Sequence, residues 1–412
     1  MAVKSTRCRR FVRRAFLSFP LKTMPDSRVL QGRRRTRGFL GQSLVVSLAA
    51  LTVLVGLPRL AVRGAAAQEN GQFSGERLYA EAKAAETVEQ QNRVLEKIER
   101  FREGQTGTEL NDYLIKLEAW LLHQRGEAHA KKAAEANRRG ETDIGRRLDA
   151  KAMEDFDAAI RLAPDRWKSY HHRGVCYALM GEFERALSDF SKTIELRPQY
   201  ANAWFNRGEI QYELGRFDKA IDDYTQAIQR EPEDAGYYTS RGHTHFQLRQ
   251  FQKALDDYNR AVSLDPENQE YLANRGDAWR TLGQWSKAAD DFRQAIRLDK
   301  TFGRAYQAAA WLMATCPDPQ FRNANLAVQA AQRAIELDGE TGYIHLDTLA
   351  AALANGGQFE QARKVLLQAI ESAPRENLEP LHSRLSLYRA HKPYRQPAHA
   401  TAARPLDKPK RY

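Results

Sequence analysis

The sequence has few cysteines and none of the short motifs that mark common catalytic sites. Its three cysteines are Cys8, Cys176 and Cys316, and no C-x-x-C pair occurs. The glycine-rich phosphate-binding loop, the G-x-S-x-G of serine hydrolases and the H-E-x-x-H of zinc peptidases are also missing. We therefore predict no catalytic residue, no metal site and no cofactor, and we expect a protein that is not an enzyme.

Acidic residues are nearly missing from the first 67 residues. This segment carries fourteen Lys and Arg and a single acid, Asp26, so its net charge is +13, whereas that of the whole chain is +12. The rest of the chain therefore has a net charge of −1. Binding of nucleic acid needs cations clustered on the folded part of a protein. We predict no nucleic-acid partner.

The same segment has the layout of a secretory signal peptide. A basic stretch ends at Arg37, Phe39 to Leu57 is uncharged and mostly apolar, and Ala65 and Ala67 precede Gln68. We predict cleavage between Ala67 and Gln68 and export to the periplasm or cell envelope. An uncleaved anchor in the inner membrane stays open, because the uncharged stretch is nearly long enough to span a bilayer. A segment without a targeting role also stays open.

A 34-residue period dominates the sequence after this segment. Arg-Gly pairs recur at that spacing, as Arg173-Gly174, Arg207-Gly208, Arg241-Gly242 and Arg275-Gly276. An alanine and an aromatic residue follow each pair at fixed distances, as in Ala220 and Tyr224. Four copies in register indicate a repeat architecture in which each unit packs against its neighbours.

Each repeat unit is predicted to form two antiparallel helices. In residues 201–234, Ala220 and Tyr224 share one face of the second helix, at helical spacing. Gly215 is expected to end the first helix and Pro232 the second. We expect Trp204, on the first helix, to be buried between hairpins.

The recurring glycines lie inside predicted helices, where glycine costs roughly 1 kcal/mol relative to alanine. They therefore indicate a close approach of the two helices of a hairpin. The positions concerned are Gly174, Gly208, Gly242 and Gly276.

These residues resemble the tetratricopeptide repeat (TPR) family, and in particular exported bacterial TPR proteins. The family's 34-residue unit has Trp, Leu, Gly, Tyr, Gly, Ala, Phe, Ala and Pro at set positions. The resemblance implies an all-α TPR-type superhelix, a solenoid of antiparallel helical hairpins. The sequence departs from the pattern in having Arg before the glycine and Asp sixteen residues later. We predict Arg–Asp pairs that tie helices together within or between units, with the aspartates Asp189, Asp223, Asp257 and Asp291.

The period also survives in less regular parts of the chain. Fourteen extra residues near Gly140 are read as two added turns on each of two helices, and the stretch around Pro317 as an enlarged turn. The predicted organisation is a signal peptide or anchor (1–67), a degenerate helical repeat (75–118), a repeat with a lengthened hairpin (119–166), four regular repeats (167–302), a repeat with an enlarged turn (303–342), a further repeat (343–376), a capping helix (377–390) and a disordered basic tail (391–412).

The resemblance implies a concave groove lined by the first helix of each hairpin. Aromatic residues among mixed charges suit a peptide or protein ligand. The groove residues expected from the family are His171, Phe205, Glu209, Tyr212, Thr239, His243, Phe246, Asp277 and Arg280. Some family members clamp a carboxylate with Lys and Asn, and this chain has other residues at those positions. That ligand is not expected.

Three weaker candidates for chemistry are interpreted as structural. His243 and His245 lie two apart on a helix and so point to different sides, which makes a poor metal pair. His171 and His172 are interpreted as ordinary groove or surface residues, and Cys316 has no motif that supplies a base. Acidic pairs such as Asp222-Asp223 recur in consecutive units, as structural devices do.

The sequence therefore predicts a non-enzymatic protein–protein interaction scaffold of the bacterial cell envelope, which binds a peptide or partner protein in its groove. Two alternatives stay open. One is a non-catalytic subunit of an envelope enzyme complex, and the other is a self-assembling structural envelope protein.

Overall fold

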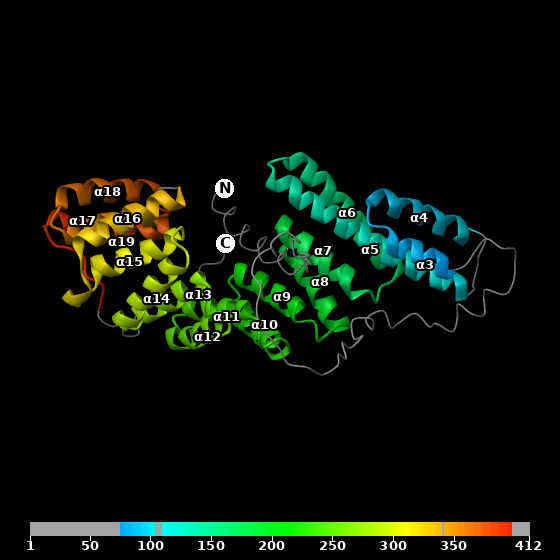
Figure 1. Ribbon diagram of the computed structural model, residues 1–412, viewed down its shortest axis with the longest axis horizontal. Coiled ribbons are helices and arrows are strands. Elements are labelled where there is room, and N and C mark those ends of the chain that lie inside the picture. Colours follow the sequence, from blue (N-terminus) through cyan, green and yellow to red (C-terminus); the bar gives the residue numbers. More distant parts are fainter. Residues whose placement is uncertain (1–74, 104–108, 340–341, 398–412) are drawn as a thin grey trace, which may run out of the picture. The chain divides into compact units, whose positions relative to one another are not determined.

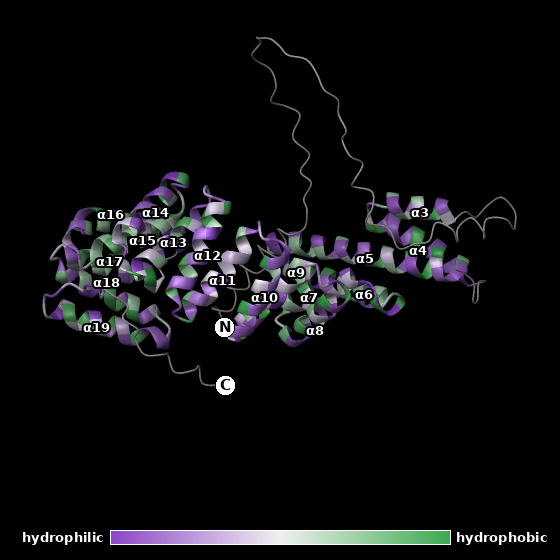
Figure 2. Cartoon of the chain, turned by 90° about the horizontal axis from the view of Figure 1, so that it is seen from below, coloured by the Kyte–Doolittle hydropathy of each residue, from purple (hydrophilic) through white to green (hydrophobic). Residues whose placement is uncertain are grey.

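The computed structural model (Figure 1) describes residues 75–103, 109–339 and 342–397. Every element in these ranges is a helix, and each helix carries both hydrophobic and hydrophilic residues (Figure 2). The predicted all-α class of helical hairpins is thus confirmed. The predicted leader and its cleavage site lie outside the described residues. No helix within the described ranges is both long and apolar enough to cross a membrane.

The chain divides into two compact units, with the boundary between Ile210 and Gln211. The first unit contains α3 (Gly75–Ala84), α4 (Val88–Arg102), α5 (Glu109–Arg138), α6 (Thr142–Leu162), α7 (Trp167–Met180), α8 (Phe183–Leu196) and most of α9 (Ala201–Glu213). Helices α5 and α6 pair as one hairpin, and α7 and α8 as the next.

The hairpin of α5 (Glu109–Arg138) and α6 (Thr142–Leu162) is longer than the hairpin of α7 and α8, and it reverses at Gly140, whose φ is +80°. Helix α6 has 21 residues against 14 in α8, which is the two extra turns expected. Helix α5 has 30 residues, far more than predicted, and it runs across the predicted boundary at residue 119. Its first half packs against α3 and α4 through Leu78, Ala82, Val94, Ile98, Leu114, Leu117 and Leu121.

The second unit continues the hairpins. It contains α10 (Phe217–Arg230), α11 (Ala235–Gln247), α12 (Phe251–Leu264), α13 (Gln269–Thr281), α14 (Trp285–Leu298), α15 (Gly303–Thr315), α16 (Ala324–Asp338), α17 (Tyr343–Asn355), α18 (Phe359–Ser372) and α19 (Leu378–Arg389). The enlarged turn between α15 and α16 includes a short 3-10 helix, Pro319–Phe321. Helix α19 covers the last hairpin with Leu381, Leu385 and Tyr388, all of which are buried.

Three of the recurring glycines each face an aromatic ring of the partner helix. A Cβ atom added to Gly276 would lie 2.5 Å from Cε1 of Phe292, and one added to Gly242 would lie 2.8 Å from Cε1 of Tyr258. In the first unit, a Cβ on Gly174 would lie 3.0 Å from Cε1 of Phe190. The glycine is therefore needed because the ring occupies the space that any side chain would fill.

The predicted Arg–Asp pairs form within hairpins. Nε and Nη2 of Arg241 donate to the two carboxylate oxygens of Asp257 at 3.0 and 2.7 Å. Arg275 binds Asp291 in the same way at 2.8 and 2.7 Å, and Arg173 binds Asp189 at 2.8 Å through both nitrogens. Two parallel hydrogen bonds between charged groups are among the strong polar contacts in proteins.

In two of these arginines, the third nitrogen reaches the preceding hairpin. Nη1 of Arg241 donates to Thr225 Oγ1 on α10 at 3.0 Å. Nη1 of Arg173 likewise donates to Asp157 on α6, at 2.7 Å. One arginine thus joins its own hairpin to its predecessor, so the predicted ties act both within and between units. For Arg207 and Asp223, which fall in different units, the pairing stays a prediction.

Trp204 is not buried between hairpins as expected, because it is only partly buried. Its indole nitrogen donates to the carbonyl oxygen of Pro198 at 2.9 Å, and the guanidinium of Arg207 lies 5.0 Å from the ring centre. Ala220 and Tyr224, by contrast, are fully buried.

We expect Gly276→Ala to destabilise the second unit, because its methyl group would collide with Phe292. Overpacking typically costs about 1–3 kcal/mol, partly offset by about 1 kcal/mol from the better helix propensity of alanine. Urea unfolding followed by circular dichroism measures the change. Ser286→Ala, an exposed site on α14, is the matched control and should lie near wild type. A Gly276→Ala protein as stable as this control would contradict the packing described.

Candidate functional site

The predicted groove residues of the first unit are His171, Phe205 and Glu209. His171 and Phe205 are only 4% and 7% exposed. Nδ2 of Asn206 lies 3.0 Å from His171 Nε2, and the ring of His171 packs edge-on against Tyr200. His171 and Phe205 therefore belong to the interior, contrary to their predicted place on an accessible surface. Glu209 is partly exposed.

In the second unit, one of the predicted groove residues is interior and the others are partly exposed. Thr239 is 1% exposed, and its hydroxyl donates to the carbonyl oxygen of Ala235. It is therefore a packing residue. The partly exposed residues are Tyr212, His243, Phe246, Asp277 and Arg280.

These residues form two rows that follow the period of the repeat. Tyr212, Phe246 and Arg280 occupy one row, and His243 and Asp277 the other. Phe246 packs edge-on against Phe251 of the same hairpin, with ring centres 5.1 Å apart. The aromatic side chains are thus held by the hairpins while part of each remains accessible.

Asp277 joins two first helices of the second unit. Its carboxylate accepts hydrogen bonds from Arg280 on α13, at 3.3 Å, and from Arg304 on α15, at 3.0 Å. Arg304 also donates to Oδ1 of Asn274 at 2.7 Å. The acid and its two cations hold one another in place, so this part of the surface is ordered before any partner binds.

Residues 391–397, which follow α19, pack against the second unit. The prediction of a disordered tail from His391 is wrong for these residues, while residues 398–412 lie outside the described ranges. Arg395 donates to the carbonyl oxygen of Ala314 at 3.0 Å and to Oδ1 of Asn355 at 2.9 Å. The backbone N–H of Gln396 donates to the carbonyl oxygen of Thr315 at 2.8 Å. We call residues 393–397 the C-terminal segment.

This segment contacts the first helices of three successive hairpins. Nη1 of Arg280 on α13 donates to Gln396 Oε1 at 3.0 Å. On α15, the ring of Trp311 lies 6.0 Å from that of Tyr394, and the guanidinium of Arg384 lies within 5.5 Å of both ring centres. Ala314 stands one repeat period after Arg280, so the segment follows the row that begins at Tyr212.

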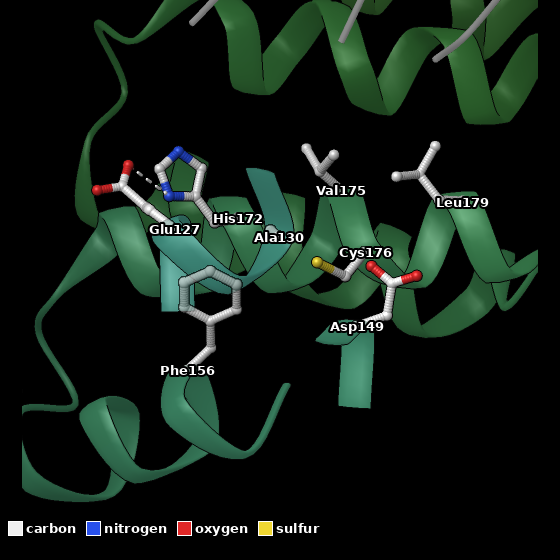
Figure 3. Close-up of a pocket in the computed structure, with 8 residues that line it drawn as sticks. All are labelled: Glu127, Ala130, Asp149, Phe156, His172, Val175, Cys176 and Leu179. Atoms are coloured by element: carbon white, nitrogen blue, oxygen red, sulfur yellow. Dashed lines mark ion pairs between the residues drawn. The ribbon is translucent and has the colours of Figure 1, made fainter. Parts of the chain in front are cut away.

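A second cluster lies in the first unit, where α5 meets α7. His123 and Glu127 come from α5 and His172 from α7, and their ligand-type atoms all lie within 4.8 Å of one another. Glu127 Oε1 lies 3.1 Å from His172 Nδ1 (Figure 3). Glu127 Oε2 lies 3.6 Å from His123 Nε2. The rings of His123 and His172 stack almost parallel, with centres 5.0 Å apart.

Burial controls the protonation of this cluster. It raises the pKa of the Glu127 carboxyl to about 7, against the opposing effect of Lys168 and Arg166. It holds the pKa values of His123 and His172 well below the ordinary value, with neighbouring histidines and the same two cations acting in the same direction. Both imidazoles are therefore neutral at physiological pH, as metal ligands must be.

Sequence reasoning missed this cluster. It considered His172 only beside His171, whose pKa burial lowers to about 4 and which turns toward Asn206. The signal present in the sequence was the spacing of four between His123 and Glu127, which places both on one side of a helix. His172 joins them only through the packing of α7 on α5.

The two cysteines of the described residues are free and buried. Burial raises the pKa of the Cys176 thiol to about 12, and it also raises that of Cys316. A thiol is nucleophilic as its thiolate. The interpretation of Cys316 as a structural residue therefore agrees with its surroundings.

We expect a chain that ends at Lys392 to lose protection of α15 against hydrogen exchange. It would lack the Tyr394 contact and the hydrogen bonds of Arg395 and Gln396, and each such bond is typically worth about 1 kcal/mol. A chain that ends at Pro397 keeps the segment and is the matched control. Exchange at Ala314 and Thr315 should be faster in the shorter chain alone. Equal exchange in both chains would show that the segment does not stabilise α15.

Models of the tetratricopeptide repeat match four consecutive stretches of the chain, residues 167–200, 201–234, 235–268 and 269–302. These are the four repeats in which the 34-residue period is regular. Comparison with curated proteins found no match.

Several solved structures are similar over part of the chain. YrrB, described as a TPR protein with an unusual peptide-binding site, is 22% identical, covers 47% of this chain and 97% of its own, and has a TM-score of 0.40. MamA from Desulfovibrio magneticus is 21% identical, with coverage of 43% and 96% and a TM-score of 0.37. A tetratricopeptide repeat protein from Parabacteroides merdae is 17% identical, with coverage of 64% and 98% and a TM-score of 0.44.

The similarity to these solved structures is too low to say which ligand this chain binds. The fold is identified by the four matches to the repeat models. Tetratricopeptide repeats are generally non-catalytic modules that bind other proteins, which makes this chain a protein–protein interaction scaffold. Its regular hairpins, with their glycine–aromatic contacts, are four tetratricopeptide repeats, and the chain belongs to the tetratricopeptide repeat family.

Proposed function

We propose that the protein is a non-enzymatic scaffold that binds an extended segment of a partner protein along the first helices of its second unit. The observation that carries this proposal is the C-terminal segment. Residues 394–396 lie against α13, α15 and α17, and they are held by backbone carbonyl groups and by Asn355 and Arg280. The same helices thus already bind an extended stretch of polypeptide.

The C-terminal segment contacts the row of Tyr212, Phe246 and Arg280 at Arg280. The partner would lie on the residues that come before Arg280 in the two rows. Tyr212, His243 and Phe246 are partly exposed there and precede Arg280 along the rows. They offer aromatic surface and an imidazole ring, and Asp277 adds a carboxylate. Aromatic anchors beside polar groups are typical of sites that bind peptides with few strong contacts.

Site-specific photocrosslinking in cells tests this placement. We expect p-benzoylphenylalanine in place of Phe246 to form a covalent product with a partner protein. The same amino acid in place of Lys253, an exposed residue on α12 of the same hairpin, is the matched control and should form none. Adding Asp277→Lys should lower the yield at position 246 while the helical circular dichroism spectrum stays unchanged.

The identity of the product separates the alternatives. Equal yields at positions 246 and 253, or none at either, would count against a binding surface on the first helices. A product made of two copies of this chain would favour a self-assembling structural protein. A product with an enzyme would favour the role of a non-catalytic subunit.

We further propose that the protein works in the bacterial cell envelope and that its first 67 residues direct export. The support comes from the basic stretch, the apolar stretch and Ala65-x-Ala67 before Gln68. A cleaved leader would release the scaffold, and an uncleaved one would tether it to the inner membrane.

N-terminal sequencing of the protein from fractionated cells distinguishes these outcomes. We expect a chain that starts at Gln68 in the periplasmic fraction. A chain that keeps the leader in the membrane fraction would favour the anchor. An uncleaved chain in the cytoplasm would contradict export, and it would leave the crosslinking prediction unaffected.

A further inference from the structure

We propose that His123, Glu127 and His172 form a binding site for a divalent transition-metal ion, best suited to Zn²⁺, which fastens the lengthened hairpin to the following repeat. Two imidazole nitrogens and one carboxylate oxygen are a donor set that Zn²⁺ accepts, with water as the fourth ligand. The site lies wholly within the first unit and does not depend on the proposed function.

The distances from Glu127 to the two histidines are close to the ligand–ligand distances around a bound ion. Ligand atoms about 2.0–2.1 Å from a tetrahedral Zn²⁺ lie about 3.3 Å from one another. The two separations that involve Glu127 are 3.1 Å, to His172 Nδ1, and 3.6 Å, to His123 Nε2. All three ligand atoms lie within 4.8 Å of one another. Because the planes of the two imidazoles are only 7° apart, the rings must rotate before both lone pairs point at one ion.

His123 presents an unsatisfied nitrogen to this site. Its side chain is fully buried, and among the described residues Nε2 has no hydrogen-bond partner. A buried polar atom without a partner is costly, and such atoms often mark a missing ligand. The other ring nitrogen, Nδ1, lies 3.2 Å from Ser169 Oγ. When Nδ1–H donates to this hydroxyl, the lone pair of Nε2 faces Glu127.

Ser169 therefore plays the part of an outer partner that orients a metal-binding histidine. Such partners fix the tautomer of the ring and the direction of its free lone pair. Ser169 lies on α7 and is fully buried, so its side chain is surrounded by packed residues and not by water. The arrangement joins α5 to α7 through His123 on one side and through His172 on the other.

There is room beside two of the ligands for a bound water. A cavity of about 20 Å³ is lined by Glu127, His172 and Asp149 together with apolar side chains, including Phe156 and Val175 (Figure 3). A cavity of roughly 10–15 Å³ already admits one water molecule.

The charges around the site act in both directions. Lys168 and Arg166 help to keep the two histidines neutral. The same cations oppose a bound dication through their positive charge. Because Lys168 is exposed, its charge can be removed without disturbing the packing. Lys168→Gln should therefore tighten metal binding severalfold.

Zinc titration of the full chain tests the proposal. The protein is treated with EDTA, freed of the chelator, and titrated with Zn²⁺ against a chromophoric chelator, while thermal unfolding is followed with and without the ion. We expect a site that binds one Zn²⁺ and a melting temperature that rises with its concentration. Co²⁺ in place of Zn²⁺ should give the visible absorption of a tetrahedral ion.

Variants assign the site to these residues. Glu127→Gln has almost the same shape as wild type, and it should lose this Zn²⁺ and the Co²⁺ absorption while the circular dichroism spectrum is kept. Ser169→Ala should weaken binding about 10–100-fold, as loss of an outer partner does. His382→Gln, at an exposed position in the second unit, is the matched control and should bind as wild type does.

The proposal is overturned if the wild-type chain binds no Zn²⁺, or if Glu127→Gln binds it as tightly as wild type. It is also overturned if His382→Gln loses the ion while Glu127→Gln keeps it, because the bound ion then lies elsewhere. Tighter binding by Lys168→Gln supports this location, since a distant site would not respond to that charge.

Discussion

The hairpins depend on one composite contact between their two helices. A glycine on the first helix lies under an aromatic ring of the second, and the residues just before these two, arginine and aspartate, form a paired hydrogen bond. Close approach of the backbones brings the guanidinium to the buried carboxylate, and the ion pair in turn fixes the rotation of each helix. Because the third nitrogen of Arg241 reaches Thr225, the same residue also sets the position of the preceding hairpin.

This contact leaves the accessible part of the first helices for binding. In the second unit, the partly exposed Tyr212, Phe246 and Arg280 follow one another at the repeat period. At the carboxyl end, the chain uses the same row for its own C-terminal segment. The segment is held through helix-end carbonyl groups of Ala314 and Thr315, which have no partner within the helix. The unpaired carbonyl groups at the end of α15 thus accept hydrogen bonds from an extended chain.

The cluster of His123, Glu127 and His172 arises where the repeat departs from its regular form. The long helix α5 carries two of its members, and the glycine contact of that hairpin, Gly126 with Phe156, lies between them. Phe156 also lines the cavity beside Glu127 and His172. The contact of Gly126 with Phe156 brings α5 and α6 close together. The same packing therefore buries the side chains of the cluster.

The sequence alone determined the hairpins, their turns at residues such as Gly215, the close approach of the two helices at the recurring glycines, and the Arg–Asp pairs. These features are local or recur in each repeat, so one pattern describes all copies. Tertiary structure decided that His171, Phe205 and Thr239 are buried, that residues 391–397 fold back onto the second unit, and that His172 meets Glu127. Each of these depends on a contact that occurs once, between residues distant along the chain, and a repeating pattern carries no information about such a contact.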